Sequence, residues 1–132
     1  MRLNIAANEN DWPFKISQSN VAADTFIYLR ADRKNIKVNF DDILFIEGLK
    51  DYTKVVTKDE TIVTKQAISS IEENLPNDLF IRTHRSFIVS VNKIESYTYE
   101  LIQVGKYELP ISRSYRHEVE NALKKWFWSY FM

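Results

Sequence analysis

The chain of 132 residues contains no cysteine. A disulfide framework, a thiolate zinc site and a cysteine nucleophile are therefore excluded. Glycine is scarce, with only two residues, whereas aromatic residues make up 14% of the chain. Aromatic side chains suit pleated, half-buried surfaces, so this composition favours β-strands over a helix bundle.

The chain also lacks an excess of charge and a long apolar run. Lys and Arg together number 18, as do Asp and Glu, so the formal net charge is zero. This balance gives no electrostatic sign of a nucleic-acid partner. No stretch approaches the roughly 18 to 20 apolar residues that cross a membrane, and residues 1–10 show no secretion signal. We therefore expect a cytoplasmic protein without a membrane span.

Apolar patterning divides the chain into three parts. Residues 1–24 are polar and show no sustained period, which predicts an N-terminal arm or linker. Residues 25–124 are expected to form one domain, because about 100 residues are enough for a single hydrophobic core. Residues 125–132 are expected to form an aromatic C-terminal tail. This tail could pack on the domain, provide a dimer or partner surface, or lie on a membrane surface, and the sequence leaves these three readings open.

Short apolar runs that alternate with turn residues predict a mostly β fold of small antiparallel sheets. Residues 36–40 alternate cleanly between apolar and polar side chains, and the run at 43–46 ends at Gly48. Residues 58–60 form a short polar link between two apolar pairs, which is typical of a hairpin. The expected strands lie near residues 25–29, 36–40, 43–46, 52–57, 62–63, 80–81, 87–91, 94–99, 101–104 and 107–111.

One short internal helix and one C-terminal helix complete the prediction. Ile68, Ile71 and Leu75 lie at helical spacing. Thr64 is placed to cap the start of this helix, and Pro76 is placed to end it. The C-terminal helix is predicted by apolar residues at helical spacing, with Ser112 or Ser114 as its cap. Its apolar positions are Val119, Ala122, Leu123, Trp126 and Tyr130.

The most informative polar segment is residues 79–94, which contain Arg82, His84, Arg85 and Lys93 but no acidic residue. Guanidinium, imidazole and hydroxyl groups donate hydrogen bonds to phosphate oxygens and base edges, and an arginine can bind guanine bidentately. A solvated turn with surface ion pairs explains the same residues equally well.

Two further basic segments are weaker signals by themselves. The first lies where the last strand passes into the last helix, and a capped helix start with charges on its exposed face would account for it. It comprises Ser112, Arg113, Ser114, Arg116 and His117. The second is residues 50–54, which contain two lysines and two hydroxyl groups, and an ordinary loop would account for it.

Taken in order, these segments resemble the LytTR family, the DNA-binding output domain of bacterial response regulators of the LytR and AlgR kind. The run FIRTHRSFIV at 80–89 carries most of the resemblance, which extends over about residues 26–123. The other matching segments are DILFIE at 42–47, KDY at 50–52, LP at 75–76, NKIE at 92–95 and LPISRSY at 109–115.

The resemblance implies sequence-specific binding of double-stranded promoter DNA by loops that enter successive major grooves. It implies base contacts from Arg85 and Arg113. A third base contact is expected from the loop after residue 47, where we assign it to Thr53, with Tyr52 as the alternative. Phosphate contacts or positioning are expected of Lys50, Tyr52, Lys54, Lys65, Arg82, His84, Ser86, Ser114 and Arg116.

The resemblance also implies partners. Family members often bind direct repeats as a pair, so we expect a homodimer on DNA. A receiver domain of a two-component system, or another partner protein, could be joined through the N-terminal arm or the C-terminal aromatic tail, and a stand-alone regulator is the alternative.

Other function classes have less support in the sequence. We expect no cofactor, no metal and no enzymatic activity, because catalytic and metal-ligand motifs are missing. A protein-interaction or RNA-binding module that uses exposed aromatic side chains is the competing function.

Overall fold

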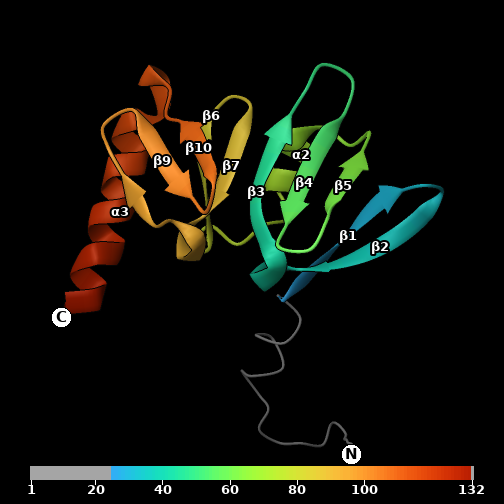
Figure 1. Cartoon of the computed structure of the whole chain (residues 1–132), viewed down its shortest axis with the longest axis horizontal. Helices are drawn as coiled ribbons and strands as arrows, with labels where there is room; N and C mark the ends of the chain where they lie inside the picture. The colour runs from blue at the N-terminus through green and yellow to red at the C-terminus, as the bar shows by residue number, and fades with distance from the viewer. Residues whose placement is uncertain (1–24, 132) are drawn as a thin grey trace, which may run out of the picture.

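A computed structural model describes the backbone of residues 25–131 and the side chains of residues 25–125. It confirms a mostly β fold of small antiparallel sheets (Figure 1). The central sheet has five strands in the order β5-β4-β3-β7-β6. These are β3 (Ile43–Gly48), β4 (Thr53–Thr57), β5 (Thr61–Thr64), β6 (Phe80–His84) and β7 (Phe87–Ser90).

The central sheet is buried on both faces. Ile46 and Val55 face one apolar cluster, whereas their neighbours Phe45 and Val56 face the other. Successive side chains of a strand point to opposite faces, so a strand buried on both sides must be apolar at consecutive positions. This is why β3, β4 and β7 contain unbroken apolar runs in place of the alternation seen in β2 (Lys34–Asn39).

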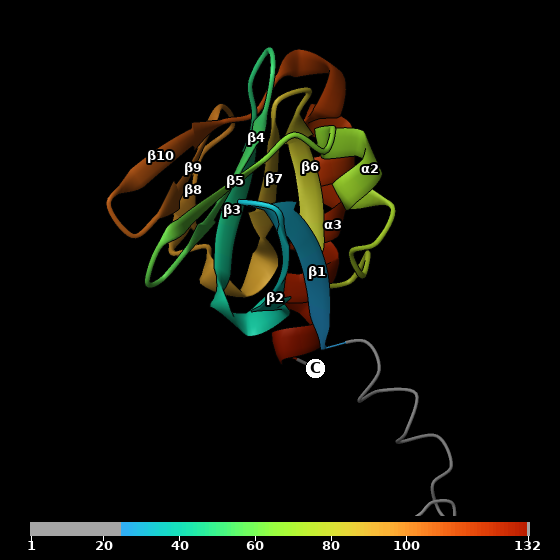
Figure 2. The same cartoon turned by 90° about the vertical axis from the view of Figure 1, so that its right-hand side faces the viewer.

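A different layer covers each face of the central sheet (Figures 1 and 2). One face packs against the hairpin of β1 (Phe26–Ala31) with β2, and against the short helix α2 (Ile68–Glu72). The other face packs against a three-stranded sheet and the C-terminal helix α3 (Arg116–Phe131). The three strands of that sheet are β8 (Ser96–Tyr97), β9 (Leu101–Val104) and β10 (Tyr107–Pro110).

The helix starts differ from the prediction. Thr64 belongs to β5 and donates its hydroxyl to Gln66 Oε1, so it does not cap α2, whose N-cap residue is Ala67 without a side-chain bond. Ser112 makes no side-chain cap hydrogen bond, and Ser114 lies inside the turn that precedes the second helix. A 3-10 turn, η4 (Arg113–Tyr115), comes first, and α3 starts only at Arg116.

The last helix, α3, continues to Phe131, so it includes most of the aromatic C-terminal tail, as the helical spacing of Trp126 and Tyr130 predicted. The buried side chains of Val119 and Leu123 attach its first half to the three-stranded sheet. The side chains of residues 126–132 and the expected N-terminal arm, residues 1–24, lie outside the described part of the chain. No helix among the described residues is long and apolar enough to cross a membrane.

Candidate nucleic-acid interface

Three connections that are distant in sequence meet at one end of the molecule (Figures 1 and 2). They are the β3–β4 loop (residues 49–52), the β6–β7 turn (residues 85–86) and the β10–α3 junction (residues 111–115). We call this the loop end. The amide of Gly48 donates to the carbonyl of Ser86 (2.8 Å), and the amide of Ser112 donates to the carbonyl of Thr83 (2.9 Å). Backbone hydrogen bonds therefore join the three connections to one another.

A β-bulge at Thr83 leaves its carbonyl free to accept the hydrogen bond from the Ser112 amide. In the β6–β7 pairing, Arg82 lies opposite Ile88 and His84 lies opposite Phe87, which leaves Thr83 as an extra residue. A bulge releases one residue from the ladder and turns its groups in a new direction. The freed carbonyl of Thr83 binds the amide of Ser112, which precedes η4. The bulge thus fixes the position of the segment that carries Arg113.

Arg82 holds the same region together through its side chain. Its Nε donates to the carbonyl of His84 (2.9 Å), its Nη1 pairs with Glu72 of α2 (2.5 Å), and its Nη2 donates to the carbonyl of Arg85. Its guanidinium also lies over the ring of Tyr115, 5.9 Å from the centroid. The Arg82 side chain is only 15% exposed. This arrangement leaves little of Arg82 exposed for the phosphate contact that we expected, and its bonds hold the β6–β7 turn to α2.

His84 and Ser86 shape the β6–β7 turn. The Ser86 amide donates to Nδ1 of His84 (3.0 Å), and the imidazole packs edge-on against Phe87 at 5.7 Å. An imidazole whose Nδ1 accepts a hydrogen bond carries a donor only at Nε2 when it is neutral. His84 therefore stabilises the turn through its Nδ1 atom.

The two arginines expected to contact bases lie at the loop end. Arg85 is exposed in the β6–β7 turn, and Arg113 is exposed at the start of η4. Within the described part of the chain, neither guanidinium has a hydrogen-bond or ion-pair partner. Their backbones are fixed by neighbours, and their side chains remain available to a ligand.

Thr53 does not fit the base contact that we expected of it. It is only 2% exposed, and its hydroxyl donates to the carbonyl of Gln66 (2.7 Å). The preceding residue, Tyr52, is 39% exposed, and Lys50 is exposed in the same loop. In this loop, therefore, the side chains that can reach a ligand come before the first residue of β4.

A hollow of about 320 Å³ connects the β3–β4 loop with the β6–β7 turn. It also includes the link from β5 to α2, which carries Lys65. Gly48 allows this close approach, since a Cβ at its position would lie 3.2 Å from two side-chain atoms of Ile68. The lining residues are 48–53, 65–68 and 85–86.

The remaining candidates differ in their availability. Ser114 is exposed, with its hydroxyl 3.4 Å from that of Ser112. Lys54 is half-buried on β4. Arg116 is held elsewhere, because its Nε donates to the carbonyl of Tyr99 (3.2 Å) and its guanidinium lies 4.0 Å from the centroid of the Tyr99 ring.

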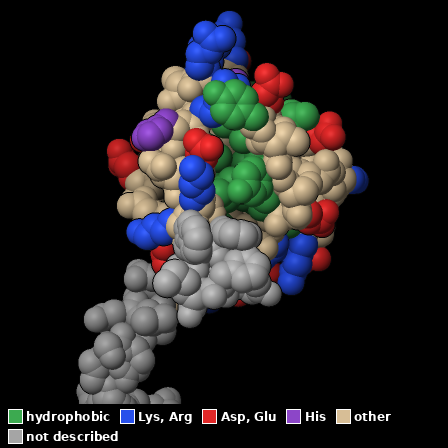
Figure 3. Space-filling model, turned by 90° about the vertical axis from the view of Figure 1, so that its left-hand side faces the viewer, with side chains coloured by type: hydrophobic (Ala, Val, Ile, Leu, Met, Phe, Trp, Pro, Cys, Tyr) green, Lys and Arg blue, Asp and Glu red, His purple; other side chains and the backbone are tan. Residues whose placement is uncertain are grey.

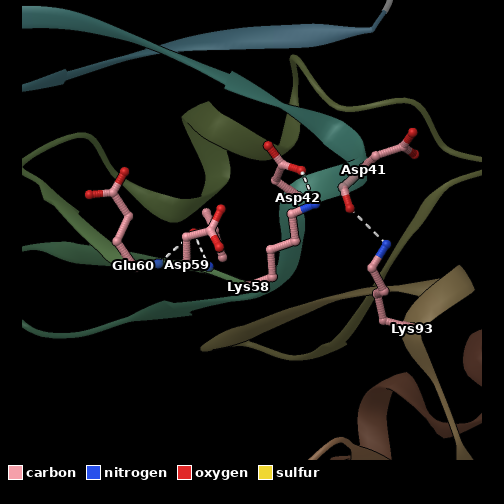
Figure 4. Close-up of polar contacts among 7 residues, drawn as sticks. Asp41, Asp42, Lys58, Asp59, Glu60 and Lys93 are labelled. Atoms are coloured by element: carbon pink, nitrogen blue, oxygen red, sulfur yellow. Dashed lines mark hydrogen bonds and ion pairs between the residues drawn. The ribbon is translucent and has the colours of Figure 1, made fainter.

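The neutral chain has an uneven distribution of charge. Figure 3 shows Lys and Arg side chains at the tip of the loop end. At the opposite end, η2 (Phe40–Asp42) and the β4–β5 turn bring four carboxylates together (Figure 4). Lys58 pairs there with Asp42 (3.3 Å), and Lys93 donates to a main-chain carbonyl. The four acidic residues are Asp41, Asp42, Asp59 and Glu60.

The loop end is not free of carboxylates, however. Asp51 is exposed in the β3–β4 loop, next to Lys50, and lines the hollow. Among the described residues it has no cation partner. Glu72, by contrast, is neutralised by Arg82.

Several residues that build this site gave no signal in the sequence. Gln66 accepts hydrogen bonds from the Arg30 amide and the Thr64 hydroxyl, and its own carbonyl accepts from Thr53. Glu72 was not distinguishable from any exposed helix residue, and neither were the bulge at Thr83 or the ring of Tyr115. Each role depends on contacts between segments far apart in sequence.

Comparison with known proteins agrees with this architecture. Residues 33–124 match the model of the LytTr DNA-binding domain. A solved LytTr DNA-binding domain from Bacillus cereus superimposes with a TM-score of 0.65 at 30% identity, covering 75% of this chain and 96% of that one.

Curated relatives are longer regulators. The sensory transduction protein LytT of Bacillus anthracis is 31% identical over 83% of this chain and 48% of its own length. The heme-containing CO-sensing transcriptional regulator RcoM 2 of Paraburkholderia xenovorans is 30% identical over 67% of this chain and 36% of its own length. The chain thus spans less than half of these relatives. The family match, the shared fold and the arrangement of loops together show that this chain belongs to the LytTR family of DNA-binding domains.

Proposed function

We propose that this domain binds double-stranded DNA sequence-specifically, as the output module of a bacterial transcription regulator. One observation carries the proposal: Arg85 and Arg113 are exposed, and have no partner among the described residues, on two connections that backbone hydrogen bonds hold together at one end. An arginine is the commonest reader of guanine in the major groove. Placing two of them on fixed turns limits the conformational entropy that binding would cost.

The surrounding side chains supply contacts that do not read sequence. Lys50 and Lys65 line the hollow beside Arg85, and Ser114 is exposed beside Arg113. Lysines and hydroxyl groups bind phosphate oxygens and fix the register of a protein on the duplex. Tyr52, half-exposed in the same loop, can add a hydrogen bond from its hydroxyl. Base reading and backbone anchoring would therefore come from neighbouring positions.

The opposite charge of the two ends supports this orientation on DNA. A duplex attracts the basic loop end and repels the carboxylates of η2 and the β4–β5 turn. Because the net charge of the chain is zero, its orientation during approach to DNA depends on how the charges are distributed over its surface. This makes approach through the loop end the favourable one.

Exposed aromatic residues offer little support for RNA binding or for a protein-interaction surface. Tyr28 lies on β1, and Tyr97 lies on β8, so these rings are on separate outer layers. One face of the Tyr99 ring is occupied by the guanidinium of Arg116, 4.0 Å from the ring centroid. A stacking platform for bases needs neighbouring rings on one surface.

Regulatory context would come from outside the domain. Relatives more than twice as long as the matched segment carry further chain in addition to this module. We propose that a receiver or another sensory segment controls this domain, and that two copies bind direct repeats side by side.

Selection from a randomised duplex pool at two salt concentrations tests the function. The domain and an Arg85→Ala, Arg113→Ala double variant would be compared by sequencing the bound DNA. For the unaltered domain we expect a DNA motif that occurs twice, with the two copies about one helical turn of DNA apart. The double variant should no longer select this motif. Binding that enriches no sequence and disappears at the higher salt concentration would refute sequence-specific recognition.

A further inference from the structure

We infer that the tip of the β1–β2 hairpin is an additional phosphate-binding surface, which holds the duplex beyond the sequence read by the loop end. The inference rests on the proposed DNA binding and adds a second place of contact. The surface consists of Arg30, Arg33, Lys34 and Lys65. All four side chains are exposed, and within the described part of the chain none has a hydrogen-bond, ion-pair or ring partner.

Away from the loop end, these four cations differ from most other basic side chains in the described part of the chain. Most other described basic side chains away from the loop end are engaged. Lys58 pairs with a carboxylate, Lys93 binds a carbonyl, and Arg116 stacks on a tyrosine. Lys37 and Lys106 lie over aromatic rings, at 4.5 and 5.6 Å from the centroids. Cations left free in one place are available to a ligand with several negative charges.

The turn at the hairpin tip holds an arginine where glycine would fit more easily. β1 and β2 are joined by two residues, Asp32 and Arg33, whose φ angles are +52° and +64°. Two consecutive positive φ values define the type I′ turn, in which glycine is preferred at the second position. A side chain in this conformation brings its Cβ close to the backbone. The turn therefore presents a cation at a position that does not favour any L-residue.

A groove connects this tip to the loop end. Its volume is about 800 Å³, and its lining includes Arg30, Arg33, Tyr52 and Lys65 together with the carboxylates of Asp32 and Asp51. The same Tyr52 and Lys65 also line the hollow beside Arg85. The hairpin surface and the proposed base-reading surface therefore share a border.

Gln66 holds the hairpin in place relative to the loop end. Its side-chain oxygen accepts from the Arg30 amide (2.9 Å), and its carbonyl accepts from the hydroxyl of Thr53 (2.7 Å). Thr53 is the first residue after the β3–β4 loop. One glutamine thus links β1 to the strand that leaves the loop end, and the basic tip keeps a fixed position.

The order of the segments indicates which DNA the tip would meet. In Figure 1 the β10–α3 junction, the β6–β7 turn, the β3–β4 loop and the β1–β2 tip follow one another from left to right. The tip lies to the side of the loop end and lower. A duplex laid along the three connections would pass the tip with a flanking segment, beyond the bases contacted by Arg85 and Arg113. Its role there would be contact with phosphates, which positions a protein on the duplex without reading its sequence.

The experiment uses the motif selected by the unaltered domain. Affinity is measured on duplexes that carry this motif with flanks lengthened on one side or the other, and at several salt concentrations. The test variant is Arg33→Gly with Lys34→Gln, which removes two cations and gives the turn its preferred residue. The control is Lys106→Gln with Lys125→Gln, which removes the same charge from the β9–β10 turn and from α3.

For the unaltered domain we expect lengthening one flank, and only one, to raise affinity several-fold. The test variant should lose this gain and keep the same preferred motif. The slope of log K against log salt should fall by about 1.8 for two lost phosphate contacts. The control variant should retain both the gain and the slope. Because glycine suits the turn, the melting temperature of the test variant should not fall.

An unchanged salt slope or an unchanged flank effect in the test variant would overturn the inference while leaving the proposed function intact. Failure of the unaltered domain to select any motif is a different result, because it would refute the proposed function itself. A change in the preferred motif would also overturn the inference, since it would place the tip among the base contacts.

Discussion

The guanidinium of Arg82 donates to the main-chain carbonyl of Arg85, so one arginine fixes the backbone from which the other projects. Arg82 also pairs with Glu72 of α2 and lies over the ring of Tyr115, two residues after Arg113 in the same 3-10 turn. A single half-buried cation thus contacts both segments that present the exposed arginines. Replacing Arg82 is therefore expected to reduce the discrimination between cognate and random DNA.

Arg82→Lys tests this positioning role because the substitution keeps the charge and removes the planar, forked donor set. We expect cognate affinity to fall about tenfold, or about 1.4 kcal/mol, with little change on random DNA. Competition titrations with both duplexes would measure it. Arg116→Lys is the matched control, since Arg116 is bound to Tyr99. An equal loss on both duplexes would instead indicate a direct phosphate contact by Arg82.

Replacing either exposed arginine should remove one element of base recognition. For Arg85→Ala and for Arg113→Ala we expect a loss of roughly 1 to 3 kcal/mol on the cognate site, with relaxed preference at one position each. Binding to a panel of single-base variants of the site would locate that position. Lys125→Ala serves as the control. A loss of the same size on every sequence would contradict base reading.

Asp51 should weaken binding to DNA of any sequence. A carboxylate about 6 Å from a phosphate is repelled by about 0.7 kcal/mol in a water-like dielectric, which is about threefold in affinity. Asp51→Asn should therefore raise the affinity for random and cognate duplexes alike by about that factor and leave the preference for the cognate site unchanged. Asp59→Asn, at the acidic end, should have no such effect. Affinity that stays constant in Asp51→Asn would place this residue away from the bound duplex.

Replacing Thr83 or Thr64 by valine should change the free energy of unfolding in opposite directions. The Thr83 hydroxyl is fully buried and has no hydrogen-bond partner among the described residues, whereas that of Thr64 bonds Gln66. An unsatisfied buried hydroxyl costs about 1 to 3 kcal/mol. Thr83→Val should therefore raise the free energy of unfolding by about 1 kcal/mol, while Thr64→Val should lower it by about as much. Urea denaturation followed by circular dichroism would measure both.

DNA binding should be unaffected by Thr83→Val, because the bond that positions Ser112 uses the main-chain carbonyl of Thr83. If Thr83→Val instead lowered both the free energy of unfolding and the affinity for DNA, the Thr83 hydroxyl would have a hydrogen-bond partner in solution.

The strand pattern could be predicted from the sequence because each strand is short and bounded by turn residues. The two-sided burial of the central sheet follows from the same runs, ILFI in β3 and FIV in β7. Positions of Arg85 and Arg113 at turns were also predictable, since each follows an apolar strand. Local pattern was sufficient for these features.

The details of the site required tertiary contacts. The resemblance placed Thr53 in the contacting loop, but the loop closes one residue earlier through the bond from the Leu49 amide to the Tyr52 carbonyl. The free charge of Arg82 could not be distinguished from a paired one, because its partner Glu72 lies ten residues away in another element. Thr64 was a reasonable cap by composition, but the chain stays extended to Ala67 before α2 begins.

The central sheet, covered on both faces, has a thermodynamic consequence for association. The connections of the loop end join strands whose core residues, such as Ile46 and Ile88, are fully buried. Backbone hydrogen bonds hold these connections to one another. A recognition surface built in this way does not fold upon binding. The heat-capacity change on complex formation should therefore match the area of the interface alone, without the additional negative contribution that accompanies coupled folding.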